Sequence, residues 1–334
     1  MKKTQSLEDA IRKTLLSTAA GVGGDFIPTP LSREFIRFIR DKNFLRQLFD
    51  VRFMTAKTLS VPKILGKTKV YYQPTEGGNA DKSNFTTGTL QLEAKKFMSE
   101  VDISEEVIED AQENMIGLIK EDFAGGIAEA EEEAMLVGDP DHSPTTATES
   151  LADDTTWFTR DHKMIYYGLL TLAADIAGSI ADDTRAANRV SAGSADMTTA
   201  IVREAKYNLG KFGRVMSDLI LILNPWSVNQ LLDDPKLVTL EKYGPNATIF
   251  TGEIGKLYGK VTVIESPFMT NGYGLITHRA NPVIGDRRRI SIKADDVITN
   301  DTKIFVVTER LDFMVRYKGA LCQIYGLDEP STAS

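Results

Sequence analysis

Apolar and polar residues alternate along the chain from residue 51 to 103, which is typical of β-strands. A polar stretch, 73–88, separates two alternating runs and is rich in the glycine, proline and asparagine residues of turns. The alternating apolar residues are Val70, Tyr72, Leu90, Leu92 and Ala94. We therefore expect a long two-stranded ribbon with a polar tip. It needs packing partners, because an isolated hairpin is only marginally stable.

The apolar period changes to 3.6 after Ser104. This serine is a suitable N-cap, and two glutamates follow it in the first turn, where the helix dipole favours acids. From Ile108 to Val137, apolar residues recur in eight steps over 29 residues. A glycine–aspartate–proline stop signal then follows. These signals predict a helix over 104–138, about 50 Å long at a rise of about 1.5 Å per residue.

Shorter elements are predicted elsewhere. The first 30 residues, with a glycine cluster at 21–24, indicate a flexible arm, and a capped apolar stripe predicts a surface helix over 31–48. Small polar residues over 139–161 indicate a surface loop, and small and polar residues return over 179–196. The second half predicts a helix over 197–212, a buried strand over 219–223, a short helix ending at Leu232, and strands over 261–264, 274–276, 290–292, 304–307, 314–317 and 321–325.

The composition is that of a folded, soluble protein. Of the 334 residues, 42% are hydrophobic and 26% are charged, and the length leaves room for about two domains. No apolar run approaches the roughly 20 residues that span a bilayer, and charged residues interrupt the N-terminal segment where a secretory signal would be apolar. The single cysteine excludes an internal disulfide, and the net charge of −8 disfavours sequence-specific nucleic-acid binding. We expect an intracellular protein without a membrane partner.

Candidate chemistry is sparse. Asp139, Asp141 and His142 are close enough in sequence to form a metal site, although an acidic loop at a helix end is more often simply solvated. Cys322 lies in a strand pattern and is interpreted as a small buried hydrophobic residue rather than a nucleophile. No Walker A, G-x-S-x-G or G-x-G-x-x-G motif is present. We expect neither an enzyme nor a cofactor, and keep an acidic metal-dependent hydrolase as the alternative from a different class.

Charge is concentrated in three places. Residues 51–98 hold eight bases and three acids, whereas 104–137 hold eleven acids and one base. We interpret these acids as a solvated or interface-facing helix surface, because no Glu-x-x-His motif points to a metal cluster. Arg287, Arg288 and Arg289 follow an expected turn and lack the interleaved aromatic residues of a phosphate-binding patch. An inter-subunit salt bridge fits them better, with plain solvation as the alternative.

Short motifs occur in a fixed order along the chain. They are Gly23-Gly24-Asp25-Phe26-Ile27-Pro28, Val101-Asp102-Ile103-Ser104-Glu105-Glu106, Glu131-Glu132-Glu133-Ala134-Met135-Leu136-Val137-Gly138-Asp139, Gly168-Leu169-Leu170 and Leu257-Tyr258-Gly259-Lys260-Val261. With the ribbon and the long helix between them, this order resembles the major capsid protein family of tailed bacteriophages. The resemblance covers most of the chain, with Val261 where proline is usual.

The resemblance implies an α+β protein with the phage major capsid fold, which has an N-terminal arm, an extended β-ribbon loop, a long spine helix, a peripheral domain and an axial domain. The implied segments are the arm 1–30, a short peripheral helix 31–50, the extended loop 51–103, the spine helix 104–138, a surface loop and connection 139–195, the axial domain 196–283, returning peripheral strands 284–328 and a tail 329–334.

The implied function is self-assembly into pentamers and hexamers of an icosahedral shell around double-stranded DNA. Such a shell forms in the host bacterial cytoplasm and becomes the virion capsid. Implied partners are further copies of the chain, scaffolding, portal and decoration proteins, and DNA by non-specific proximity. Only 22 residues precede Gly23, which implies a separate scaffolding protein or none. The same-fold alternative is an encapsulin-type compartment shell that holds a cargo enzyme.

Candidate inter-subunit contacts are charged residues of the ribbon, the long helix and the arginine run. They are Lys57, Lys63, Lys67, Lys69, Lys82, Glu105, Glu109, Glu113, Arg287, Arg288 and Arg289. Some family members crosslink a ribbon lysine to a neighbour's asparagine, but these lysines match by type alone and we expect no crosslink. Two hypotheses explain the charge: the ribbon lies over an acidic surface of the adjacent subunit and steers assembly, or the acidic helix face lines the cavity and repels packaged DNA.

Overall fold

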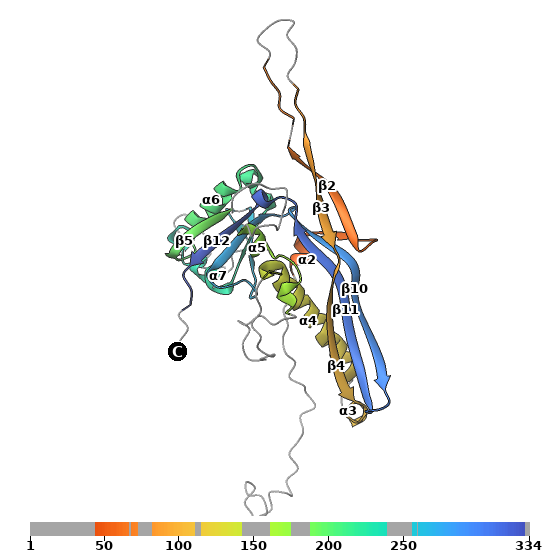
Figure 1. Cartoon of the computed structure of the whole chain (residues 1–334). Helices are drawn as coiled ribbons and strands as arrows, with labels where there is room; N and C mark the ends of the chain where they lie inside the picture. The colour runs from red at the N-terminus through yellow and green to blue at the C-terminus, as the bar shows by residue number, and fades with distance from the viewer. Residues whose placement is uncertain are drawn as a thin grey trace, which may run out of the picture. The chain divides into compact units, whose positions relative to one another are not determined.

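This computed structural model describes residues 44–66, 68–72, 82–110, 115–141, 161–174, 188–238, 256–258 and 260–330. The expected arm and most of the expected helix over 31–48 lie outside these residues, and the described end of that helix is α2 (Leu45–Leu48). The described elements belong to one compact unit, Arg40–Ser334. They form two β-sheets, a two-stranded ribbon and the helices that pack on them (Figure 1).

The first sheet has four strands in the order β1-β10-β11-β4. They are β1 (Asp50–Phe53), β4 (Lys95–Ser104), β10 (Pro282–Val297) and β11 (Thr302–Val315). β10 and β11 form a long antiparallel hairpin, β4 pairs antiparallel with β11, and β1 pairs parallel with the first residues of β10.

The strands of this sheet are longer than expected. The strand predicted over 304–307 and the first two residues of the one predicted over 314–317 belong to a single strand, β11, which ends at Val315. The strand predicted over 290–292 is a fraction of β10. The apolar pattern breaks inside β11 because Glu309 and Asp312, which are 2% and 8% exposed, place charged groups at buried positions. When an inward-facing position carries a charged residue, the alternation of apolar residues is interrupted and the strand is not recognised at its full length.

The ribbon consists of β2 (Thr58–Gly66) and β3 (Thr86–Glu93), which pair antiparallel. The expected ribbon is therefore present, but it is shorter than 51–103, because β1 and β4 belong to the first sheet. Val70 and Tyr72 are not in a strand, contrary to the expected alternation, and are 98% and 87% exposed. The residues 73–81 of the expected polar tip lie outside the described residues.

The root of the ribbon packs on the first sheet of its own chain. Leu90 and Leu92 share a buried cluster with Met54 and Val283. Asp312 of β11 accepts a hydrogen bond of 2.6 Å from the backbone N–H of Glu93, the last residue of β3. The packing that an isolated hairpin lacks is thus supplied within the chain for the root.

The stretch predicted as one long helix contains α3 (Glu105–Asp110) and α4 (Met115–Val137), with 111–114 outside the described residues. The inner face of α4 presents Ile119, Phe123 and Ile127 to Phe305 and Val307 of β11. α4 therefore packs along the first sheet (Figure 1). The spacing of four residues is that of one face of an α-helix.

The second sheet has six strands in the order β5-β12-β9-β6-β8-β7. They are β5 (Arg189–Ala195), β6 (Leu219–Leu223), β7 (Lys256–Leu257), β8 (Val261–Glu265), β9 (Tyr273–His278) and β12 (Leu321–Leu327). The remaining described helices are α5 (Leu169–Ala173), α6 (Thr199–Asn208), α7 (Pro225–Leu232), α8 (Pro235–Val238) and the 3-10 helices η2 (His162–Met164), η3 (Gly210–Arg214), η4 (Met216–Asp218) and η6 (Lys318–Ala320).

Two strands of the second sheet differ from expectation. Residues 284–328 are expected as peripheral strands, yet β12 lies between β5 and β9 in the second sheet. β5 arises in a stretch with no strand pattern, because only Val190 of its residues is buried. Its parallel pairing with β12 is a tertiary contact that local sequence does not report.

Two glycines let the end of α4 meet the start of α5. The N–H of Gly168 donates to the carbonyl oxygen of Gly138 over 2.7 Å, and Thr171 Oγ1 donates to the same oxygen over 2.8 Å. A Cβ on Gly168 would stand 2.4 Å from the backbone nitrogen of Gly138, and a Cβ on Gly138 would stand 2.4 Å from the carbonyl oxygen of Tyr166. Neither position admits another residue without a backbone shift, so the two glycine motifs meet for a steric reason.

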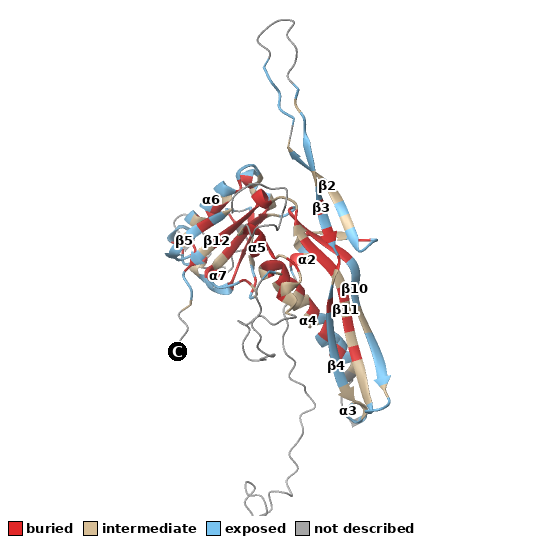
Figure 2. Cartoon of the chain, in the orientation of Figure 1, coloured by how far each residue is buried: buried red, intermediate tan, exposed pale blue. Residues whose placement is uncertain are grey.

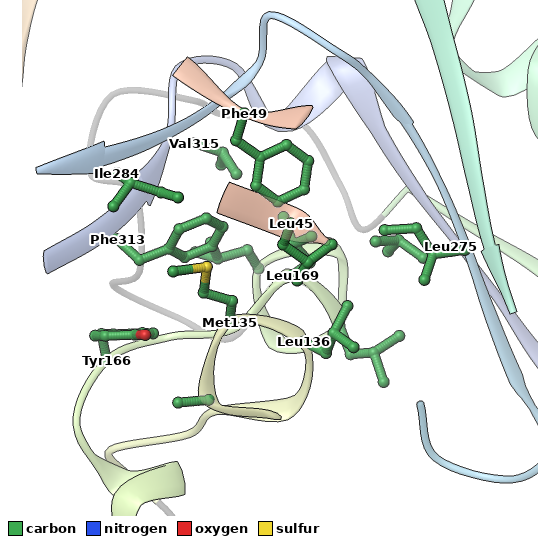
Figure 3. Packing of buried hydrophobic residues seen from close by; sticks show 14 of the residues in the cluster. Leu45, Phe49, Met135, Leu136, Tyr166, Leu169, Leu275, Ile284, Phe313 and Val315 are labelled. Carbon is green, nitrogen blue, oxygen red and sulfur yellow. The ribbon is translucent and has the colours of Figure 1, made fainter. Parts of the chain in front are cut away.

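The largest buried cluster joins the two sheets (Figure 3). It contains Leu45 of α2, Leu136 of α4, Leu169 of α5, Leu275 of β9 and Phe313 of β11. Figure 2 shows buried residues where α2, α4 and α5 meet the sheets and also along the strands of the second sheet. Among the described helices, none is both long and apolar enough to cross a lipid bilayer.

Replacing Phe313 with alanine should lower the free energy of unfolding by about 3–5 kcal/mol, because this side chain is 1% exposed and its loss leaves a cavity. The matched control is Phe85→Ala, whose ring is 57% exposed, and its effect should stay within about 0.5 kcal/mol. Urea denaturation of the unassembled chain measures both, and equal effects would show that the core lies elsewhere.

Candidate assembly interface

The distal half of the ribbon exposes large apolar side chains. Ile64 and Leu65 at the end of β2 and Phe85 just before β3 are 57%, 36% and 57% exposed, and Tyr72 is 87% exposed. Figure 2 shows this end of the ribbon as exposed, in contrast to its root. Apolar side chains gathered on one hairpin are typical of a surface that binds another molecule.

Four of the five candidate lysines belong to the described residues, and Lys67 does not. Lys57 pairs with Glu93 across the ribbon root over 2.7 Å, and both side chains are more than half exposed. Lys63 is half-buried, whereas Lys69 and Lys82 are exposed on the distal ribbon. Lys57 thus has a partner in its own chain, and the distal lysines accompany the exposed apolar residues.

The acids of the long helix fall into two groups. On α3, Glu105 is half-buried and Glu109 is exposed, while Glu113 lies outside the described residues. Glu131 and Glu132 on α4 are only 3% and 2% exposed. The expectation of a solvated or interface-facing surface is therefore wrong for this end of the helix, because these acids have partners inside the fold.

Arg46 of α2 collects three carboxylates. Its guanidinium lies 2.8 Å from Glu131, 3.1 Å from Asp286 and 2.9 Å from Glu309. Burial and the negative charges of Glu131 and Asp286 raise the pKa of Glu309 to about 7, against the lowering effect of Arg46. Although burial lowers the pKa of Arg46, the surrounding carboxylates raise it above its ordinary value. The cluster joins α2, α4, β10 and β11.

The next acid of the run, Glu133, is held by η2. His162 Nε2 lies 2.6 Å and Lys163 Nζ 3.2 Å from its carboxylate. Burial raises the pKa of Glu133, but its interactions with His162 and Lys163 outweigh burial and lower the pKa below its usual value. The acidic run that closes α4 is therefore an internal anchor for neighbouring segments.

The three consecutive arginines each contact their own chain. Arg287 donates to the carbonyl oxygen of Met54 over 3.0 Å, and Arg288 donates to Thr308 Oγ1 over 2.7 Å. Arg289 lies 3.6 Å from Asp286, with its side chain 73% exposed. All three arginines are exposed within β10, so each leaves part of its charge open to solvent.

A groove of about 300 Å³ lies between β4 and α4. Its apolar wall is formed by Phe97, Met98, Val101, Phe123 and Ile127, and Asp122 and His162 also line it. Met98 and Val101 are 53% and 37% exposed. β4 is an edge strand of the first sheet, so backbone groups border the groove as well.

The candidate chemical groups give no catalytic constellation among the described residues. No group of three or more metal-ligating side chains occurs there, and His142 of the candidate metal site lies outside it. Asp141 accepts a hydrogen bond from Tyr167 Oη over 2.8 Å. Cys322 is fully buried in β12, and burial raises the pKa of its thiol to about 12. A buried neutral thiol is a packing group, not a nucleophile.

Solved structures share this fold. The capsid of a native GTA particle matches with a TM-score of 0.71 at 16% identity, over 93% of this chain and 98% of that chain. A chain of Mycobacterium phage Adephagia matches with a TM-score of 0.64 at 14% identity, over 94% and 99% of the two chains. A chain of Microbacterium phage Oxtober96 matches with a TM-score of 0.63 at 14% identity, over 92% and 98%. The α+β architecture is therefore that of capsid proteins.

Residues 23–208 match the phage capsid family, and the chain belongs to that family. The major capsid protein of Escherichia phage T5 is 22% identical over 310 residues, which are 89% of this chain and 61% of that protein. The major capsid protein of Klebsiella oxytoca phage phiKO2 is 28% identical over 137 residues, 41% of this chain and 32% of that protein. The chain thus spans less than two thirds of either relative. The family consists of structural proteins, which overturns the alternative of a hydrolase.

Sequence reasoning misses the Arg46 cluster. A signal was present: Asp286, Glu309 and Asp312 are acids within otherwise apolar strand patterns, and buried acids require partners. The sequence does not indicate that Arg46 is the cation that pairs with these acids, because Arg46 is 240 residues away from Asp286 and 263 from Glu309 along the chain.

Replacing Arg46 with glutamine should lower the free energy of unfolding by about 3–5 kcal/mol, because it leaves buried carboxylates without their cation. The control is Arg52→Gln, whose partner Asp50 is 40% exposed in a pair of 3.2 Å, and its effect should stay below about 1 kcal/mol. Urea denaturation at pH 7 gives both values, and a loss below 1 kcal/mol for the Arg46 variant would contradict its anchoring role.

Cys322 should resist modification by a thiol-specific reagent at pH 8 in the folded chain and react fully in urea, because its thiol is buried and protonated. Absorbance of the released chromophore follows the reaction. Rapid labelling of the folded chain would restore the nucleophile interpretation.

Proposed function

We propose that the chain is a major head protein that self-assembles into pentamers and hexamers of an icosahedral shell around double-stranded DNA. Membership of the phage capsid family supports this proposal. The observation that carries it further is the ribbon, whose root is packed on its own chain while its distal half exposes apolar side chains. An exposed apolar hairpin of this kind is explained if a neighbouring subunit covers it.

In this proposal the first sheet with α3 and α4 forms the peripheral domain. The second sheet forms the axial domain, and it includes β5 and β12, which lie outside the expected 196–283 segment, as well as strands of that segment. The proposed partners are other copies of the chain, scaffolding, portal and decoration proteins, and DNA by non-specific proximity. The match to phage capsid proteins favours this genome container over an encapsulin-type compartment.

We further propose that the ribbon's distal lysines meet an acidic surface of the adjacent subunit. Lys69 and Lys82 are exposed beside the apolar residues of the ribbon, and Lys63 is half-buried on β2. On the receiving side the exposed acids Glu106 and Glu109 of α3 are suitable, because Glu131 and Glu132 are buried in their own chain. Opposite charges at the rim of an interface act mainly on the rate of association. Arg287, Arg288 and Arg289 are further candidate contacts by their exposure.

Electron microscopy of the purified chain tests the assembly proposal. Pentameric or hexameric rings or closed shells should form, and the chain should sediment as these species. The alanine variant of Phe85 combined with Ile64→Ala should keep the stability of the subunit and reduce shell formation at least tenfold, because it removes exposed apolar contacts of about 1.4 kcal/mol or more. A monomer that never assembles under any condition would overturn the proposal.

Assembly rate measured against salt separates the two charge hypotheses. If the ribbon lysines steer assembly, 1 M salt should slow it markedly, because the screening length falls to about 3 Å. The double variant Lys69→Glu and Lys82→Glu should assemble slowly even at low salt, whereas the control Lys260→Glu, an exposed lysine after β7, should assemble normally. A rate indifferent to both salt and charge reversal favours an acidic face that lines the cavity.

A further inference from the structure

The outer face of the first sheet, which is the face opposite α4, carries charges of opposite sign at its two ends. Phe305 and Val307 of β11 pack on α4, and successive side chains of a strand point to opposite faces. The alternate positions of β11 therefore lie on the outer face, and their partners on β10 and β4 form four rows with them. These rows are Arg288, Arg310 and Lys96; Ser291, Thr308 and Met98; Lys293, Val306 and Glu100; and Asp295, Ile304 and Asp102.

The first of these rows, here called the base row, places three cations side by side. Arg310 stands directly opposite Arg288 on one side and Lys96 on the other. Directly opposed residues of antiparallel strands have Cβ atoms about 4.5–5.5 Å apart, and like charges at that spacing destabilise a sheet. The pairing of β10 is also irregular on both sides of Arg288. The base row thus costs stability in a single subunit, which points to a partner of opposite charge outside it.

No ion pair joins the base row to a carboxylate in the described part of the chain. Arg288 donates to Thr308 Oγ1 over 2.7 Å, and Arg310 Nε is buried without a hydrogen-bond partner there. Asp312, next on the outer face of β11, is 8% exposed and is already hydrogen-bonded to the ribbon root. Arg288 and Lys96 are exposed and Arg310 is half-buried, so another molecule can reach the row.

The other end of the same face, here called the acid row, has the complementary charge. Asp295 and Asp102 are exposed on either side of the half-buried Ile304. Glu100, one row nearer the centre, is exposed as well, and Figure 2 shows this part of β4 and β10 as exposed. Six positions of β11 separate Ile304 from Arg310, which places the two rows about 20 Å apart at about 3.4 Å per residue.

We propose that the outer face of the first sheet is a docking surface for a second copy of this chain, with the base row of one copy on the acid row of the next. The inference rests on the proposed function, because it describes one contact of the shell. Each copy offers its acid row to one neighbour and its base row to another. Head-to-tail contacts of this kind close into rings when the rotation between copies allows it. The uncharged row beside the base row, with Met98 53% exposed, adds apolar contact area.

A second copy fits this face better than a nucleic acid does. The phosphate backbone of DNA is uniformly negative, so DNA along the face would meet the acid row about 20 Å from the base row. The ribbon of a neighbour is also unsuitable, because its exposed Lys69 and Lys82 have the sign of the base row. The acid row matches the base row in width, because its two aspartates lie on β10 and β4, the strands that carry Arg288 and Lys96.

Charge reversal within the two rows tests the contact. The base-row variant combines Lys96→Glu with Arg288→Glu, and the acid-row variant combines Asp102→Lys with Asp295→Lys. Either variant brings like charges together, so each should assemble at least about tenfold more slowly than the unaltered chain at low salt, as followed by light scattering. All four substitutions together restore opposite signs and the original net charge. This chain should assemble within about threefold of the unaltered rate.

The stability of the subunit distinguishes a lost contact from a folding defect. In the base-row variant Arg310 stands between two glutamates, and opposite charges directly across strands are favourable. The urea midpoint of the unassembled variant should therefore equal or exceed that of the unaltered chain while assembly slows. The control combines Arg203→Glu on α6 with Lys260→Glu after β7, two exposed positions. It has the same net charge as the base-row variant and should assemble at the unaltered rate.

The outcomes separate this inference from the proposed function. An unaltered chain that never assembles overturns both. If the unaltered chain assembles and both double variants keep its rate, or if the control slows as much as the base-row variant, the docking surface alone is overturned. If the chain with all four substitutions stays as slow as the double variants, the base row binds a different partner, such as DNA, and the docking surface is overturned as well.

Discussion

Both sheets depend on the C-terminal end of α4. Ala134, Met135 and Leu136 are fully buried there, in the cluster that also takes side chains from α2, α5 and strands of both sheets. Immediately afterwards, Gly138 and Gly168 bring two backbones so close that a single added methyl group would separate them. The C-terminal end of α4 therefore packs against both sheets, and a change in its buried side chains disturbs the first and the second sheet together.

The charged groups near this end of α4, Arg46 and its carboxylate partners, have a different role from the apolar side chains. A buried ion cluster contributes little net stability, because each charge loses its hydration, but it penalises every arrangement in which a charge is left without its partner. Leu45 and Phe49 alone would tolerate a shifted α2, whereas Arg46 reaches Glu131, Asp286 and Glu309 in one position. Apolar packing supplies the stability of the junction, and the ions specify its geometry.

The elements with a clear local period were predictable, and those defined by distant contacts were not. The apolar stripe of α4, the all-apolar β6 and the capped α7, where Asn224 accepts from Ser227 N–H over 2.8 Å, agree with the pattern. β5, with a single buried residue, and the unbroken β11 escaped it. For the candidate assembly interface, the sequence predicted a ribbon, because a polar stretch separates two runs of alternating residues. The burial of the acids at the end of α4 was not predictable, because their partners come from remote segments.

The place of β12 in the second sheet has a consequence for how the protein is made. β12 lies between β5 and β9, yet its residues, 321–327, are translated after those of every other described strand. At a synthesis rate of about 5–20 residues per second, β5 waits on the order of 10 s for the strand that pairs with it. The growing chain therefore cannot complete this sheet on the ribosome until residue 327 has emerged. A chain that ends before residue 321 therefore lacks the strand that joins β5 to β9.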